Sequence, residues 1–252
     1  MVFLPINDTN KRVWIRYHYV TLALIAACVA MYLFQQSGGE EGFQRMVLGL
    51  GVIPAVLFGT RELDPALALL PPVATLATNL FLHGGFMHLF SNMLFLWVFG
   101  DNIEDSMGHG RFIAFFLACG AAASLVHAMT IPGSVAPLIG ASGAISGILG
   151  AYFVLHPKVK IWVLLFAWIP LKLPTFVILG LWAVMQVVNS FAADAATDNV
   201  AWWAHIAGFA VGAGLIPLFR YPHVPLFDTS PETSMNVSGV RLRPRAHWGG
   251  KS

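Results

Sequence analysis

The chain has 252 residues, of which 57% are hydrophobic and only 10% are charged. This composition excludes an ordinary water-soluble globule, which needs far more polar surface, and predicts a membrane protein. The net charge of +2 is too small to favour nucleic-acid binding. The two cysteines, Cys28 and Cys119, lie in apolar runs, which is typical of packing residues rather than of a disulfide or a metal site.

Six apolar segments are expected to cross the bilayer, and most are long enough for about 30 Å of hydrocarbon. We predict an all-α polytopic fold with a cytoplasmic N-terminal segment at 1–13, a six-helix bundle at 14–219 and a polar, disordered tail at 220–252. Two further apolar runs, Val47–Phe58 and Ile161–Pro170, are too short to span, so we expect them in the interface or against the bundle. The six spanning segments are 14–35, 85–101, 111–130, 142–156, 174–192 and 201–219.

The basic residues predict the orientation. With six spans both termini share one side, and 12 of the 14 Lys and Arg residues fall on it, all except Arg45 and Arg61. By the positive-inside rule the termini are cytoplasmic, as expected in a bacterial inner membrane. No cleavable signal peptide is expected, because residues 1–10 are mixed in polarity. The second, fourth and sixth segments then begin toward the outer face, so their N-terminal polar residues gather there.

The stretch 140–147, at the start of the fourth segment, surrounds Ser142 with small residues. Glycines beside a serine at a helix start let a substrate approach closely, as a nucleophile requires. However, Gly143 and Gly147 also form a GxxxG pair that is typical of close helix packing, and Ser142 can serve as an N-cap. Taken alone, the stretch favours packing over catalysis.

His205 lies near the start of the sixth segment, where an intramembrane histidine is a functional candidate. Gly208 and Gly212 form a second GxxxG pair. If this pair packs on the glycine face of the fourth segment, His205 comes close enough to Ser142 to act as its general base. The alternative is a bundle histidine that is bonded to a backbone carbonyl.

A third cluster lies at the start of the second segment. His88 and Asn92 are four residues apart, so they share a helix face and can donate hydrogen bonds to a developing oxyanion. His83 is expected to brace the preceding loop. A metal site of His83, His88 and His205 is the main chemical rival, but no carboxylate lies beside these residues to support it.

The acidic residues give little support to other mechanisms. Asp101 and Asp105 fall at the cytoplasmic end of the second segment, away from the serine, and Glu104 is interpreted as part of a structural turn. Asp194 and Asp198 lie in an outer loop and are expected to be solvated. Because no acid is placed to orient His205, a Ser–His dyad is favoured over a triad.

Together, the three motifs resemble the rhomboid family of intramembrane serine proteases in its basic six-helix form, over roughly residues 10–220. The resemblance implies that Ser142 is the nucleophile and His205 its base. It also implies an oxyanion hole of His88, Asn92 and the Ser142 backbone amide. The supporting residues are His83, Gly140, Gly143 and Gly208.

The resemblance further implies that the substrates are transmembrane proteins, cut within or beside their helices in the lipid bilayer without a cofactor. The fifth segment, near Phe176 and Trp182, and the loop 193–200 would form the gate and cap. The oligomeric state is not predicted. The alternatives are a non-catalytic family member that binds transmembrane clients, and a transporter, which would be expected to show internal repeats or a polar path to the cytoplasmic face.

Two features depart from the family pattern. Many members carry an aromatic residue four positions after the nucleophile, where it stacks on the histidine, and this chain has Ser146 there. We therefore expect Trp202, Trp203 or a water molecule to orient His205. The Trp-Arg pair often found in the first outer loop is also missing.

Overall fold

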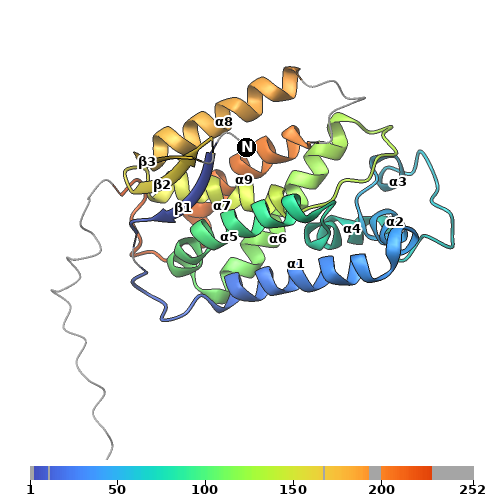
Figure 1. The fold of residues 1–252 in the computed structure, drawn as a ribbon, viewed down its shortest axis with the longest axis horizontal. Coiled ribbons are helices and arrows are strands. Elements are labelled where there is room, and N and C mark those ends of the chain that lie inside the picture. Colours follow the sequence, from blue (N-terminus) through green and yellow to red (C-terminus); the bar gives the residue numbers. More distant parts are fainter. Residues whose placement is uncertain (1–2, 11, 167, 193–199, 229–252) are drawn as a thin grey trace, which may run out of the picture.

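The computed structural model describes residues 3–10, 12–166, 168–192 and 200–228. Its main body is a helical bundle, which confirms the predicted polytopic helical fold. Figure 1 shows α1 and α8 on opposite sides of the bundle, with the other long helices between them. The six long helices are α1 (Tyr19–Ser37), α5 (Phe86–Met107), α6 (His109–Thr130), α7 (Ser142–Leu155), α8 (Thr175–Ala192) and α9 (Trp202–Phe219).

The helices differ in how they can cross a membrane. Among the described residues, α1, α6, α8 and α9 are each long and apolar enough to span alone. Helix α5 qualifies only together with Pro72–Phe81, to which it is joined by an 81° bend. Helix α7 has 14 residues, or about 21 Å, which is shorter than the hydrocarbon layer. It therefore cannot reach both surfaces of the hydrocarbon layer.

Helix α7 is the centre of the bundle, since 11 of its 14 residues are buried. It packs on α9 almost backbone to backbone. A methyl group on Gly208 would overlap the carbonyl oxygen of Gly143, and one on Gly212 would overlap that of Gly147. The predicted contact between the two small-residue faces is therefore present, and side chains larger than hydrogen would separate these helices.

The expectation of an all-α chain missed a small sheet. Strands β1 (Phe3–Asp8), β2 (Lys160–Leu165) and β3 (Ile169–Pro174) form an antiparallel sheet in the order β1-β2-β3. In β2, Ile161 and Val163 are buried while Lys160 and Trp162 are exposed, which is the period-two pattern of a strand. Further apolar residues follow this alternation in the sequence, so the run Ile161–Pro170 was not predicted to form part of a β-hairpin.

Two carboxylates at the end of α5 attach the N-terminal segment to the bundle. Asp105 accepts backbone N–H groups from Val13, Trp14 and Ile15 at 2.6–2.8 Å. Glu104 accepts the N–H groups of Val20 and Thr21 at the start of α1, at 3.0 and 2.8 Å. Both acids are thus structural, and Glu104 satisfies helix-terminal donors that would otherwise be unpaired.

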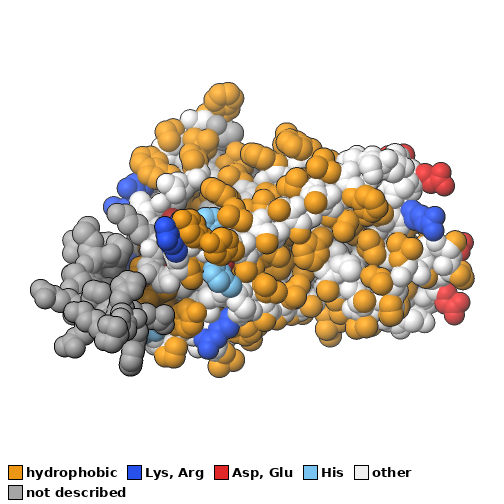
Figure 2. All heavy atoms as spheres, turned by 90° about the horizontal axis from the view of Figure 1, so that it is seen from below, with side chains coloured by type: hydrophobic (Ala, Val, Ile, Leu, Met, Phe, Trp, Pro, Cys, Tyr) orange, Lys and Arg blue, Asp and Glu red, His pale blue; other side chains and the backbone are white. Residues whose placement is uncertain are grey.

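Short elements fill the long loop between α1 and α5, and Val47–Phe58 does not span. In Figure 2, hydrophobic side chains cover the middle of the molecule while charged side chains gather at its two ends. This belt is expected of a protein that lies in a bilayer. The short elements are α2 (Gly39–Leu50), α3 (Pro54–Leu57), η1 (Pro72–Ala74), α4 (Thr75–Thr78) and η2 (Asn79–Phe81).

Candidate active site

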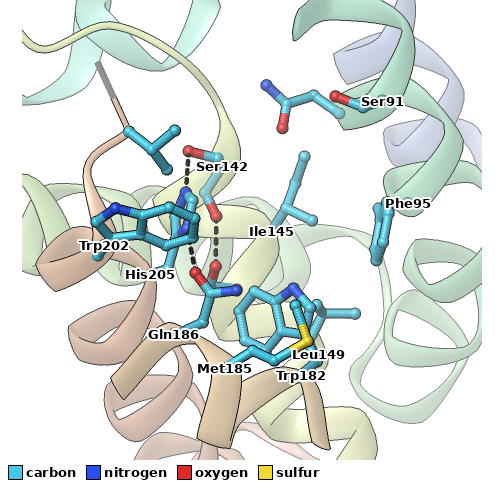
Figure 3. A pocket seen from close by; sticks show the side chains of 13 residues that line it. Ser91, Phe95, Ser142, Ile145, Leu149, Trp182, Met185, Gln186, Trp202 and His205 are labelled. Carbon is cyan, nitrogen blue, oxygen red and sulfur yellow. Dashed lines mark hydrogen bonds between the residues drawn. The ribbon is translucent and has the colours of Figure 1, made fainter. Parts of the chain in front are cut away.

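The structure brings Ser142 and His205 into contact. Ser142 is the first residue of α7, and His205 lies in the first turn of α9. The serine Oγ is 2.9 Å from Nε2 of the imidazole, as Figure 3 shows. This is the distance at which a histidine can take the hydroxyl proton as a general base. The close packing of α7 on α9 fixes the two backbones that carry the pair.

The turn that leads into α7 depends on Gly140. Its φ of +123° is unfavourable for other residues, and a Cβ there would lie 2.7 Å from Nε2 of His88. The Gly140 N–H donates to the carbonyl oxygen of Asn79 at 2.9 Å. These restraints place Ser142 at the rim of a cavity instead of inside the helix packing.

Asn92 and His88 extend from α5 toward this turn but occupy different surroundings. Asn92 lines the cavity together with Ser142. Its side-chain nitrogen is buried and has no hydrogen-bond partner among the described residues. His88 packs against Gly140 and is not one of the residues that line the cavity. Among the described residues that line the cavity, Asn92 thus supplies a buried amide donor without a hydrogen-bond partner.

His83 lies at the bend before α5 and is held through its backbone. Its N–H donates to Gln35 Oε1 at 3.1 Å, and its carbonyl accepts from Gln35 Nε2 at 3.5 Å. The His83 ring lies 5.2 Å from that of His88. These contacts suit the predicted bracing role. Within the part of the chain that the structure describes, no three His, Cys, Asp or Glu side chains group as metal ligands, so the three-histidine alternative lacks its ligand set.

Gln186 is the functional candidate that the sequence reasoning missed. Its Oε1 lies 2.8 Å from Nδ1 of His205, on the opposite side of the ring from Ser142. The expectation that Trp202, Trp203 or water would orient the ring was therefore incomplete. The Trp202 ring lies edge-on to the His205 ring, with the ring centroids 6.3 Å apart, whereas Trp203 packs on Phe191. A glutamine inside the apolar run 176–188 of a spanning helix was the available signal.

Ser146, four residues after Ser142, does not reach the imidazole. Its hydroxyl donates to the carbonyl oxygen of Ser142 at 2.7 Å, and the side chain is buried in α7. An aromatic contact with His205 comes from another helix, because Trp182 of α8 lies 6.2 Å away with its ring tilted by 33°. Helix α8 therefore supplies both a hydrogen bond and a ring contact to the histidine.

The cavity beside the pair has a volume of about 310 Å³. Its walls come from α5, α7, α8 and α9, and Phe95, Ile145, Leu149, Trp182 and Met185 make it mostly apolar. Val200 also contributes to the wall. Of the predicted cap at 193–200, residues 193–199 lie outside the described residues. Of the tail predicted as disordered at 220–252, residues 229–252 lie outside them, whereas Tyr221 donates its N–H to the Ser106 carbonyl at 2.8 Å and Val224 is buried. The arrangement combines a serine hydroxyl bonded to a histidine with an apolar cleft and an unpaired amide donor, the groups that acyl transfer requires.

Comparison of the sequence with known proteins points to one family. The family model described as the Rhomboid domain matches residues 72–222, more than half of the chain. "Rhomboid protease GluP" of Bacillus subtilis (strain 168) is 43% identical over 76 residues, 30% of this chain and 14% of that protein. "Rhomboid-like protein 11, chloroplastic" of Arabidopsis thaliana is 29% identical over 156 residues, 58% of this chain and 52% of that one. "Rhomboid protein 1, mitochondrial" of Saccharomyces cerevisiae is 36% identical over 91 residues, 34% and 26% of the two chains. The matches thus span about half or less of each relative's length.

Proposed function

Because the chain belongs to the rhomboid family, we propose that this multi-pass membrane protein is a serine endopeptidase that cuts transmembrane proteins within or beside their helices. The observation that carries the proposal is the 2.9 Å contact between Ser142 Oγ and His205 Nε2 at the edge of a cleft in the bundle. No cofactor is needed for this chemistry, because the histidine supplies the base and the cleft supplies the donors.

In the proposed mechanism His205 takes the Ser142 proton as Oγ attacks the scissile carbonyl carbon. The tetrahedral intermediate places its negative oxygen where the Asn92 amide and the Ser142 backbone N–H can donate to it. We assign the side-chain donor to Asn92, because His88 packs behind Gly140 outside the cavity. His205 then gives the proton to the leaving amine, and a water molecule hydrolyses the acyl-enzyme with the same residue as base.

The cleft suggests the substrate class. Its apolar walls accept an apolar segment, and the reacting carbonyl must leave its helical hydrogen bond before it can reach Ser142. Segments with Gly or other weak helix formers lose least on unwinding, so we expect cleavage there. By the positive-inside rule the site faces the outer side of the membrane, with both termini cytoplasmic.

The test is cleavage of a single-span model protein by the purified chain in liposomes. The substrate carries an Ala–Gly stretch near its outer membrane boundary, and Ser142→Ala and His205→Ala serve as variants. The proposal requires cleavage by the native chain that both substitutions abolish. Cleavage that survives Ser142→Ala would overturn the mechanism. Binding of the span without cleavage would favour the non-catalytic, client-binding alternative.

A further inference from the structure

The contacts of His205 divide between a rigid pair of helices and a lightly packed one. Ser142 and His205 lie on α7 and α9, whose glycine faces meet without room for a methyl group. Gln186 and Trp182, which hold the ring from the other side, both lie on α8. Only 22% of the apolar window of α8 is buried, the lowest share among the four helices that can span alone. Figure 1 shows α8 at the edge of the bundle.

The hydrogen bond from Gln186 has a chemical consequence for the histidine. A neutral imidazole carries its proton on one nitrogen and a lone pair on the other. With the amide oxygen of Gln186 at 2.8 Å, Nδ1 is the nitrogen that donates. The lone pair is then on Nε2, 2.9 Å from the Ser142 hydroxyl, where a general base needs it. Gln186 is only 4% exposed, so water does not compete freely for this bond.

The cavity places Gln186 beside the catalytic pair. Phe95 of α5 lies on one wall, and Trp182, Met185 and Gln186 of α8 lie on the other. Gln186 and Trp182 therefore contact His205 from the wall that faces α5.

We propose that Gln186 is a positioning residue that fixes His205 in the tautomer and orientation in which it can act as a base. The inference rests on the proposed protease function and adds a residue of α8 to the same site. With Gln186 in place, Nδ1 donates to its amide oxygen and the Nε2 lone pair faces the Ser142 hydroxyl. Without that acceptor the ring loses this restraint, and the activation of Ser142 is weakened.

The first test reads the histidine directly and does not depend on proteolysis. The ¹⁵N chemical shifts of His205 report which ring nitrogen is protonated, and His205→Ala identifies its signals. For the native chain in detergent we expect protonated Nδ1 and unprotonated Nε2. Gln186→Leu removes the acceptor at similar volume and should give a mixture of tautomers, whereas Gln186→Glu keeps an acceptor and should preserve protonated Nδ1. An unchanged Nδ1-protonated signal in Gln186→Leu would overturn the proposal.

The kinetic counterpart uses the same variants. Partners that orient metal-binding histidines are worth roughly 10- to 100-fold in affinity or activity, and we expect the same range for a partner that orients a catalytic imidazole. We therefore expect Gln186→Leu to lower kcat in this range with little change in KM, and Gln186→Glu to restore part of the loss. Equal activity of the native chain and Gln186→Leu would contradict the proposal while leaving the Ser142–His205 mechanism intact. An inactive native chain, in contrast, counts against the proposed function, and the ¹⁵N measurement still tests Gln186.

A double-mutant cycle tests whether α8 acts through this bond. Leu179 is fully buried on α8 about two turns from Gln186, whereas Leu181 of the same helix is 60% exposed. We expect Leu179→Ala to loosen α8 and to lower kcat in the native chain but to have little further effect beside Gln186→Leu. Leu181→Ala, the matched control, should have little effect in either background. Additive losses from Leu179→Ala and Gln186→Leu would show that α8 packing acts independently of Gln186 and would contradict the coupling.

Discussion

Two buried asparagines near the cavity differ in what their side chains bond. Asn79 is fully satisfied: its Nδ2 donates to the Thr75 carbonyl at 2.7 Å, and its Oδ1 accepts from Ser124 at 3.1 Å. Asn92 is 6% exposed, and its side-chain nitrogen has no partner among the described residues. A buried unpaired donor destabilises a fold, so its presence beside the cavity supports the oxyanion-donor role that we propose for Asn92.

This difference predicts opposite results for the same substitution. Asn92→Ala should lower kcat by about 10²- to 10³-fold, the usual effect of losing one oxyanion donor, with thermal stability unchanged or raised. Asn79→Ala should instead lower the unfolding free energy by about 1–3 kcal/mol, because it leaves partners unpaired. Cleavage kinetics and thermal unfolding in detergent separate the two effects. A large loss of stability in Asn92→Ala with full specific activity would contradict the assignment.

At the residue scale, the motifs around Ser142, His205 and Asn92 indicated their positions because each motif is local in sequence. Gln186 was missed because its role depends on a contact between α8 and α9 that no local spacing encodes. The expected tryptophan contacts with His205 were half right. Trp202 touches the ring, while the aromatic contact from across the cavity comes from Trp182 of α8 rather than from the position of Ser146.

At the scale of elements, the packing of α7 against α9 fixes the distance between nucleophile and base. Gly212 faces the Gly147 carbonyl so closely that an added Cβ would overlap it, whereas a Cβ on Gly214 of the same helix would meet nothing within 4 Å. These two glycines therefore provide a matched pair of sites on one helix.

We predict that Gly212→Ala separates α7 from α9, costs about 1–3 kcal/mol or more through overpacking, and abolishes cleavage. Gly214→Ala should be tolerated, with a gain of up to about 1 kcal/mol from the better helix propensity of alanine. Thermal unfolding and the cleavage assay measure both. Similar behaviour of the two variants would refute the claim that this contact sets the active-site geometry.

The N-terminal strand is attached to the bundle through a half-buried carboxyl group. Asp8 of β1 accepts hydrogen bonds from the Tyr152 hydroxyl and from Asn102 Nδ2, the latter at 2.8 Å. Burial is the main cause that raises the pKa of Asp8 from 3.8 to about 7, and the nearby Asp101 adds to the shift. The folded chain thus binds the Asp8 proton more tightly than the unfolded chain does.

The sign of the pH dependence follows from this difference. The stability that neutral Asp8 contributes is complete below about pH 4, falls as the pH rises toward about 7, and changes little above that value. The difference in melting temperature between the native chain and Asp8→Asn should therefore favour the native chain more at pH 5 than at pH 8. Glu41→Gln, at an exposed position, should show no such pH-dependent difference from the native chain. A melting temperature that rises between pH 5 and pH 8 in the native chain but not in Asp8→Asn would contradict the assignment.

The sheet shows why some elements were not predicted. Strand β1 pairs with β2, about 150 residues away along the chain, and Thr9 donates to the Lys160 carbonyl across this gap. A short strand whose partner is so distant has no local signal beyond its own composition. The long helices, in contrast, are indicated by runs of apolar residues, and their observed ends lie within a few residues of most predicted bounds.

At the scale of the whole molecule, the charged residues divide between the two ends of the apolar belt (Figure 2). The end with the sheet carries Lys158, Lys160 and Lys172, and the opposite end carries the loop with Glu40 and Glu41. From the positive-inside rule we expect the end with the sheet to face the cytoplasm. In that orientation, which we propose, the cleft with Ser142 is nearer the outer face.

Cysteine labelling tests this orientation, because Cys28 and Cys119 are fully buried and should not react with a maleimide. Gly133→Cys and Lys158→Cys place single exposed thiols at opposite ends of the bundle. In intact cells, a membrane-impermeant maleimide should label position 133 and reach position 158 only after permeabilisation. The reverse pattern would invert the topology and move the cleft to the cytoplasmic half.

The most direct test of the central claim is covalent labelling of the purified chain with a fluorophosphonate, with the modified residue located by mass spectrometry. The measurement asks whether Ser142 is activated by His205, and it needs no knowledge of the natural substrate. The account predicts a single adduct on Ser142 that is absent in Ser142→Ala and reduced to background in His205→Ala. Failure to label a folded native chain, or labelling of Ser142 that persists undiminished in His205→Ala, would contradict it.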